Sequence, residues 1–208
     1  MVEKNDEENS LEKLKEIQGK LDYFIWEQSG KEFEIKSYKN MIRLSTSLLV
    51  EIGELANEIK TFKVWKKKKE INYEKAKEEL MDVLCFFLGL SNLNEIKLKE
   101  KNFKTFPKFS YLAKNDDNYF IFNKLLNDLF FYASKLRIDE TNFNKYLVKQ
   151  EYNQIYKKKI NILFSNNYYN FLNNFNFVAK KLDMGENEII KMYLKKIENN
   201  YYRAKEGQ

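Results

Sequence analysis

Helix-breaking residues are scarce in this 208-residue chain, which contains six glycines and a single proline. Sandwiches and open parallel sheets need many tight turns, and such turns depend on glycine and proline. Long helices need few of them. Hydrophobic residues make up 43% of the chain, which is enough to bury a sizeable core. The sequence therefore predicts an all-α fold, and we expect one domain over residues 1–208.

Apolar residues recur three or four positions apart along most of the chain, which is the spacing of one helix face. This periodicity predicts helices over about 10–27, 36–61, 73–93, 119–136, 141–164, 167–182 and 186–205. Residues 94–118 are mostly polar and contain Pro107, so we interpret them as a connecting loop or an insertion. The expected architecture is a multi-helix bundle.

Histidine is absent from the sequence. This absence excludes serine–histidine and cysteine–histidine nucleophilic sites and the usual histidine-containing zinc sites. An enzyme made from this chain must use carboxylates and lysines, which favours hard cations such as Mg²⁺. The formal charge of +6 is weak evidence for nucleic-acid binding, because lysine and asparagine are abundant here as in the products of AT-rich coding sequences. We therefore expect no nucleic-acid partner.

The single cysteine, Cys85, allows no disulfide within the chain, which is typical of a protein of the reducing cytoplasm. The N-terminal segment MVEKNDEENS is acidic and polar, unlike a signal peptide. No apolar run approaches the length of a membrane span. We therefore expect a cytoplasmic protein that has no membrane partner.

Two pairs of carboxylates, each pair one helical turn apart, lie on consecutive predicted helices. The stretch VEIGELANE (50–58) contains Glu51 and Glu54, and the next helix contains Glu79 and Asp82. Antiparallel packing of the two helices would bring both pairs around one hollow. Carboxylates this close raise one another's pKa, and bound Mg²⁺ would compensate their charge. Such ions also activate water for attack on phosphate, so the pairs favour a metal-dependent hydrolase.

Two plainer interpretations stay open at this point. An isolated E-x-x-E is common on the solvated face of a highly charged helix, and this is how we interpret Glu58. Asp82 is the only charged residue in the apolar run 80–88. An unpartnered buried carboxylate is costly, so Asp82 could instead pair with a buried lysine or arginine. The presence of both carboxylate pairs on consecutive amphipathic helices favours the metal site.

The order of these motifs resembles that of the dimeric all-α dUTPases, which belong with the MazG-like enzymes to the all-α nucleoside triphosphate pyrophosphohydrolases. Four segments carry the resemblance: EIQGKLDYFI (16–25), LVEIGELANEIKTFKVW (49–65), EELMDVLCFFLGL (78–90) and YLKKIENNYYR (193–203). The resemblance implies a four-helix catalytic core of the type found in those pyrophosphohydrolases, and a homodimer. It also implies Mg²⁺-dependent hydrolysis of dUTP to dUMP and pyrophosphate.

The resemblance also assigns roles to the carboxylates. Glu51, Glu54, Glu79 and Asp82 are the expected metal ligands. Glu51 and Glu54 are the catalytic candidates, and Glu54 is expected to orient the attacking water.

Five further residues are expected from the resemblance to bind the substrate: Gln18, Trp65, Lys196, Asn200 and Arg203. Gln18 matches a glutamine that contacts the base, and a side-chain amide offers both a donor and an acceptor to uracil. Trp65 matches an aromatic residue that lines the nucleotide pocket. The other three share one face of the last predicted helix, which suits phosphate contacts. Without the resemblance, Trp65 is as well explained by packing on the core, and the three residues by an ordinary polar face.

Three alternatives to a strict dUTPase follow from the sequence. The first is a broader pyrophosphohydrolase that also accepts dCTP. The second is a non-enzymatic helical module that binds nucleic acid, and the third is a catalytically weak relative that serves as a protein partner. The chain has Asp22 and Ile197 where relatives carry asparagine, and these departures bear on base selectivity.

Overall fold

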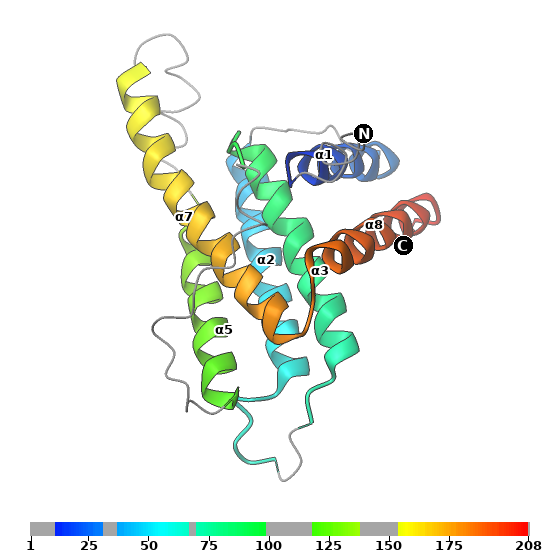
Figure 1. Ribbon diagram of the computed structural model, residues 1–208. Helices are drawn as coiled ribbons and strands as arrows, with labels where there is room; N and C mark the ends of the chain where they lie inside the picture. Colours follow the sequence, from blue (N-terminus) through cyan, green and yellow to red (C-terminus); the bar gives the residue numbers. More distant parts are fainter. Residues whose placement is uncertain (1–10, 31–36, 67–69, 99–117, 138–153, 208) are drawn as a thin grey trace, which may run out of the picture.

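The computed structural model describes residues 11–30, 37–66, 70–98, 118–137 and 154–207. Within these ranges the chain forms six helices and no strand. The helices are α1 (Leu11–Gln28), α2 (Tyr38–Ile59), α3 (Tyr73–Leu93), α5 (Asn118–Ser134), α7 (Gln154–Lys181) and α8 (Glu186–Lys205). Figure 1 shows them packed as a bundle, which confirms the all-α prediction. No helix in this part of the chain is both long and apolar enough to cross a membrane.

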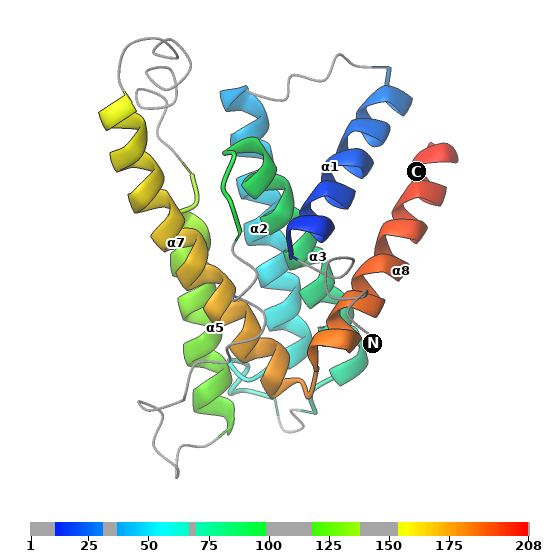
Figure 2. The same cartoon turned by 45° about the horizontal axis from the view of Figure 1, so that its top comes forward.

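Helices α2 and α3 run antiparallel at the centre of the bundle (Figure 2). Ser37 caps the start of α2 by accepting a hydrogen bond from the backbone N–H of Asn40 (3.1 Å). Lys60 ends α2 in the left-handed conformation, at φ 62°. Asn72 caps the start of α3 by accepting from the N–H of Lys75 (3.3 Å). These caps set the limits of two helices whose carboxylates can face each other.

Among the residues whose burial the structure describes, α3 has more buried side chains than any other helix, as its sequence LMDVLCFFLGL predicts. It contacts α1, α2, α7 and α8, and Leu80, Leu84 and Phe87 are completely buried. Phe87 stacks on Phe171 of α7, with 4.8 Å between the ring centroids. Each side chain of this size contributes roughly 1.5–3 kcal/mol to stability when it is fully buried. Asp82 lies in this apolar helix and is half-buried.

The remaining helices cover the central pair from two sides (Figure 2). Helices α5 and α7 pack against each other, and α5 also packs on α2. Helices α1 and α8 lie on the other side, where both contact α3 and each other. The four helices α1, α2, α3 and α8 therefore bring together the segments that carry the candidate site residues.

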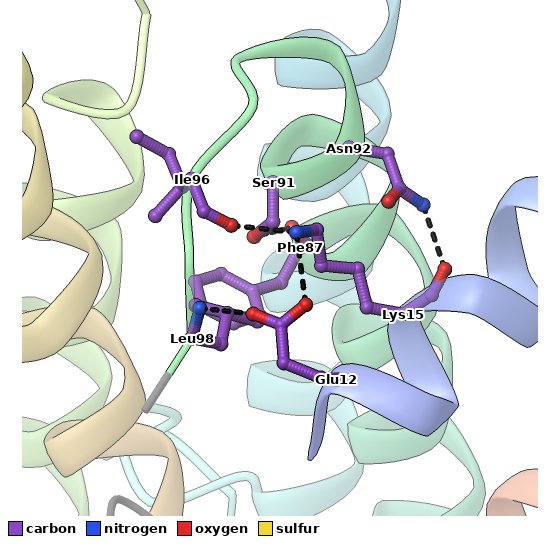
Figure 3. A network of polar contacts seen from close by, with 7 residues as sticks. All are labelled: Glu12, Lys15, Phe87, Ser91, Asn92, Ile96 and Leu98. Carbon is purple, nitrogen blue, oxygen red and sulfur yellow. Dashed lines mark hydrogen bonds and ion pairs between the residues drawn. The ribbon is translucent and has the colours of Figure 1, made fainter. Parts of the chain in front are cut away.

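The N-terminal half of α1 is tied to the end of α3 and to the segment that follows it (Figure 3). Glu12 accepts a hydrogen bond from the backbone N–H of Leu98, and Lys15 Nζ donates to the carbonyl oxygen of Ile96 (2.7 Å). Asn92 donates to the carbonyl oxygen of Lys15 (2.8 Å). Ile96 and Leu98 are themselves buried. These contacts hold α1 at a fixed position beside α3.

One helix boundary predicted from the sequence is wrong. We expected separate helices over 141–164 and 167–182, but α7 continues without a break from residue 154 to residue 181. Ser165 and Asn166 are weak helix formers, yet neither interrupts a helix as glycine or proline does. Most of the expected connection (99–117) and the first part of the helix expected over 141–164 (138–153) lie outside the described residues. The single-domain interpretation stays a prediction.

Candidate active site

Three carboxylates from two helices converge in the structure. Glu51 comes from α2, and Glu79 and Asp82 come from successive turns of α3. Each offers one oxygen, and these oxygens lie within 4.8 Å of one another. All three residues are half-buried, so solvent only partly screens their repulsion. We call Glu51, Glu79 and Asp82 the carboxylate cluster.

The pKa values of the cluster reflect this crowding. Burial and the charges of Asp82, Glu54 and Glu79 raise the pKa of Glu51 to about 7. The pKa of Glu79 is also raised, first by burial and then by Asp82 and Glu54. Burial raises the pKa of Asp82 as well, against the lowering effect of Lys196. A cation is the natural partner for three carboxylates that disfavour joint ionisation.

Glu54 and Glu58, the other acidic residues of the stretch VEIGELANE (50–58), stand apart from the cluster. Glu54 is exposed, and its charge is felt by all three cluster residues. It does not belong to the group of oxygens within 4.8 Å. Glu58 is half-buried and forms a long ion pair with Lys60 at 3.9 Å. The structure therefore brings together three of the four predicted metal ligands, with Glu54 at the edge.

The donor set of the cluster fits a divalent cation. It consists of carboxylate oxygens, which Mg²⁺ prefers, and their raised pKa values show that positive charge is favoured among them. Cys85 is buried nearby, and burial raises the pKa of its thiol. A thiol that resists ionisation is a poor metal ligand. Glu51, Glu79 and Asp82 are thus the residues that could hold Mg²⁺.

Helix α8 adds a positive charge to this group. Lys196 Nζ donates a hydrogen bond to Asp82 Oδ2 at 2.5 Å. The lysine partner that the sequence left open for Asp82 is therefore present beside the carboxylate cluster. Burial lowers the pKa of Lys196, but the hydrogen bond and the nearby carboxylates outweigh it and raise the pKa overall. The ammonium group is charged at neutral pH.

A cavity of about 450 Å³ opens beside the cluster. Glu51 and Asp82 form part of its wall, and Asn200 and Arg203 of α8 form another part. Arg203 is close enough to lower the pKa of Asp82. We call it the second cavity, because a slightly larger first cavity, described below, adjoins it. The second cavity has both carboxylates for a cation and a guanidinium group for an anion. The structure thus brings the predicted C-terminal residues to the predicted acidic site.

A first cavity, of about 470 Å³, adjoins the second and lies among α1, α2 and α3. The two share Ile25, Ser29 and Phe86 in their walls. The other residues that line the first cavity are Gly19, Asp22, Trp26, Asn40, Arg43, Leu44, Ser47, Gly89, Asn92 and Leu93. Its mixture of aromatic, apolar and amide side chains is typical of a small-molecule pocket.

Asp22 is placed at the first cavity by two neighbours. Gln18 Nε2 donates to its Oδ1 at 2.7 Å. A Cβ at Gly89 would come within 3.3 Å of Asp22 Oδ2, so the glycine leaves room for the carboxylate. Burial raises the pKa of Asp22 to about 6, while Gln18 and Arg43 lower it. The residue noted in the sequence as a departure from relatives is therefore a cavity wall residue.

The two predicted base-site residues occupy different surroundings. Gln18 is buried, with 4% of its surface exposed, and is absent from the residues that line either cavity. Trp65 is 70% exposed in the segment after α2, where it packs edge-on to Phe62. Trp26 is the tryptophan that lines the first cavity, and the Arg43 guanidinium lies 4.3 Å from its ring centroid.

The cavity residues that sequence reasoning missed include Trp26, Asn40, Arg43 and Phe86. One signal was available, because Asn40 is a polar residue on the apolar stripe of α2 and is buried. It accepts a hydrogen bond from Arg43 at 2.6 Å, one turn further along the helix. Trp26 and Phe86 gave no comparable signal, since aromatic residues are abundant throughout the chain.

Comparison with known proteins agrees with the motifs. A family model described as dUTPase matches residues 10–208, which is nearly the whole chain. Neither the curated proteins nor the solved structures provide a match. The chain belongs to the family of dimeric all-α dUTPases, which its four motifs resemble.

Proposed function

We propose that this protein hydrolyses dUTP to dUMP and pyrophosphate in a Mg²⁺-dependent reaction. The observation that carries the proposal is that Glu51 and Asp82 of the carboxylate cluster line the second cavity together with Arg203 of α8. Lys196 of α8 pairs with Asp82. Clustered carboxylates suit a divalent cation, and a triphosphate needs both a cation and basic side chains. Membership of the dUTPase family supports dUTP as the substrate.

The cluster residues would hold the metal, and Glu54 would act on the water. When bound, Mg²⁺ neutralises phosphate charge and lowers the pKa of a coordinated water. Glu54 is exposed next to the cluster, so its carboxylate is available to orient that water and accept its proton. The water oxygen bonds to one of the two phosphorus atoms, α or β, as the bond from that phosphorus to the bridging oxygen breaks. The bridging oxygen leaves with the other phosphate group. The products are dUMP and pyrophosphate.

The two adjoining cavities suggest how the nucleotide lies. We propose that its phosphates occupy the second cavity, where Asn200 and Arg203 line the wall and Lys196 lies beside Asp82. The base and sugar would then enter the first cavity, next to Asp22 and Trp26. Gln18 would act on the base through Asp22, which it holds by a hydrogen bond. A contact of Trp65 with nucleotide stays a prediction.

Two further properties are proposed from the family and the composition. We propose a homodimer, because the family is dimeric and symmetric pairs are the commonest assemblies. Sedimentation or light scattering would test it by the mass of the particle. We also propose a cytoplasmic location, because the single cysteine is a buried free thiol.

A nucleotide panel tests the proposed activity. Pyrophosphate release is measured from dUTP, dCTP, dTTP, dATP and dGTP, with and without Mg²⁺, for the wild type and Glu54→Gln. We expect turnover of dUTP alone, dependent on Mg²⁺ and strongly reduced in the variant. Comparable turnover of dCTP would replace the strict dUTPase with the broader pyrophosphohydrolase. Turnover of no nucleotide would overturn the proposal.

A further inference from the structure

We infer that Lys196 competes with the divalent cation for the Asp82 carboxylate, so that metal binding releases this lysine from its ion pair. The inference rests on the proposed function, which places the cation at the carboxylate cluster. It makes Lys196 a positioning residue that controls metal affinity, in addition to any contact it makes with substrate.

The first support is the geometry of the pair. Lys196 Nζ lies 2.5 Å from Asp82 Oδ2, and the two side chains are only 26% and 19% exposed. Asp82 is also one of the three residues whose oxygens converge in the cluster. A cation bound there would sit close to the ammonium group whichever Asp82 oxygen it used. Two positive charges at such a distance repel strongly in a partly buried site.

The second support is the charge that surrounds the ammonium group. Glu79 and Asp82 both raise the pKa of Lys196, and Lys196 lowers that of Glu51, Glu79 and Asp82. The lysine therefore acts on all three cluster residues. Its positive charge already takes up part of the attraction that a divalent cation would otherwise receive from these carboxylates.

The third support is that Lys196 can leave without moving its helix. Helix α8 is held elsewhere, because the Tyr193 hydroxyl lies 3.2 Å from the carbonyl oxygen of Leu14. Lys77 Nζ also donates to Glu188 at 2.8 Å, which fixes the start of α8 on α3. The flexible four-carbon stem of lysine needs only a change of rotamer. The released ammonium group would remain near the second cavity.

The test measures metal binding without nucleotide or turnover. The affinity for Mg²⁺ is measured by isothermal titration calorimetry, and that for Mn²⁺ by electron paramagnetic resonance, for the wild type, Lys196→Met, Lys196→Arg and Lys195→Met. Lys195→Met is the matched control, because Lys195 is the exposed neighbour on the same helix. Thermal unfolding without metal shows that each variant is folded.

At pH 8.5, above the pKa of about 7 of Glu51, we expect Lys196→Met to bind both metals about tenfold more tightly than the wild type, because a competing positive charge is removed. Lys196→Arg and Lys195→Met should stay within about twofold of the wild type. An unchanged or weakened affinity in Lys196→Met overturns the competition and leaves the proposed function standing. A wild-type chain that binds neither metal also overturns the competition, and the nucleotide panel with and without Mg²⁺ then decides the metal-dependent function separately.

Discussion

Gln18 and Asp22 form a hydrogen-bonded pair in which the amide Nε2 donates to the carboxylate Oδ1 at 2.7 Å. The other amide atom of Gln18, Oε1, accepts from the Tyr193 hydroxyl at 2.9 Å. Both polar ends of the glutamine are thus engaged inside the protein, and Asp22 is the member that lines the first cavity. The geometry supports a positioning role for Gln18, which links α8 to the cavity wall on α1.

The half-buried Asp22 carboxylate should make stability fall as the pH rises from about 4 to about 6. Its pKa is raised from the ordinary value of 3.8 to about 6. Between these two pH values the folded state therefore keeps a proton that the unfolded state releases. The contribution is full below about pH 4 and is lost as the pH passes through about 6. We expect Asp22→Asn to be more stable than the wild type at pH 8, by about 1–3 kcal/mol, and the advantage to shrink towards pH 5.

Urea unfolding at pH 5, 6.5 and 8 measures this difference. The exposed Glu16→Gln on the same helix is the control, and it should leave the pH dependence of the wild type unchanged. A constant difference between Asp22→Asn and the wild type at all three pH values would contradict the burial of a titrating carboxylate.

Metal binding should strengthen with pH around neutrality. Burial and the neighbouring carboxylates raise the pKa of Glu51 to about 7, and a ligand must lose its proton before it binds a cation. We expect the Mg²⁺ affinity to fall by up to about tenfold per pH unit below pH 7 and to level off above pH 8. Calorimetry in buffers of different ionisation enthalpy would also detect the released proton. An affinity that is constant from pH 6 to pH 8 would argue against Glu51 as a ligand.

The Tyr168 hydroxyl should contribute to stability because it joins α7 to the end of α3 in the core. It lies 2.7 Å from Asn94 Nδ2 and 3.2 Å from the carbonyl oxygen of Leu90, and the residue is only 1% exposed. Tyr168→Phe leaves these buried groups with fewer partners, so we expect a loss of about 1–3 kcal/mol in the free energy of unfolding. Tyr169→Phe, on the exposed neighbour, should lose less than about 0.5 kcal/mol. Equal losses would contradict this difference.

The two tryptophans offer a direct test of where nucleotide binds. Trp26 lines the first cavity, whereas Trp65 is 70% exposed in another segment. We expect the fluorescence change on addition of dUMP to persist in Trp65→Phe and to disappear in Trp26→Phe. The reverse result would place the base near Trp65, as the sequence predicts. Circular dichroism would show that both variants keep their helices.

The sequence was sufficient to predict the helices whose apolar spacing is regular. Helices α3 and α8 begin and end where the spacing predicts, and the antiparallel α2 and α3 bring Glu51 to Glu79 and Asp82. The continuity of α7 was missed because a run of serine and asparagine mimics a boundary. The pairing of Asp82 with Lys196 joins residues 114 positions apart, and no local pattern encodes such a contact. The first cavity was also missed, because residues from three helices far apart in the sequence form its wall and no local pattern shows that they meet.

The central claim is that the carboxylate cluster holds the catalytic metal, and adjacent glutamates on α3 test it most directly. Glu79 belongs to the cluster, whereas Glu78 is exposed. Mg²⁺-dependent pyrophosphate release from dUTP should fall by about a hundredfold or more in Glu79→Gln, because a metal ligand is lost. Glu78→Gln should keep the rate of the wild type within about twofold. Equal rates in the two variants, or release that does not need Mg²⁺, would contradict the account.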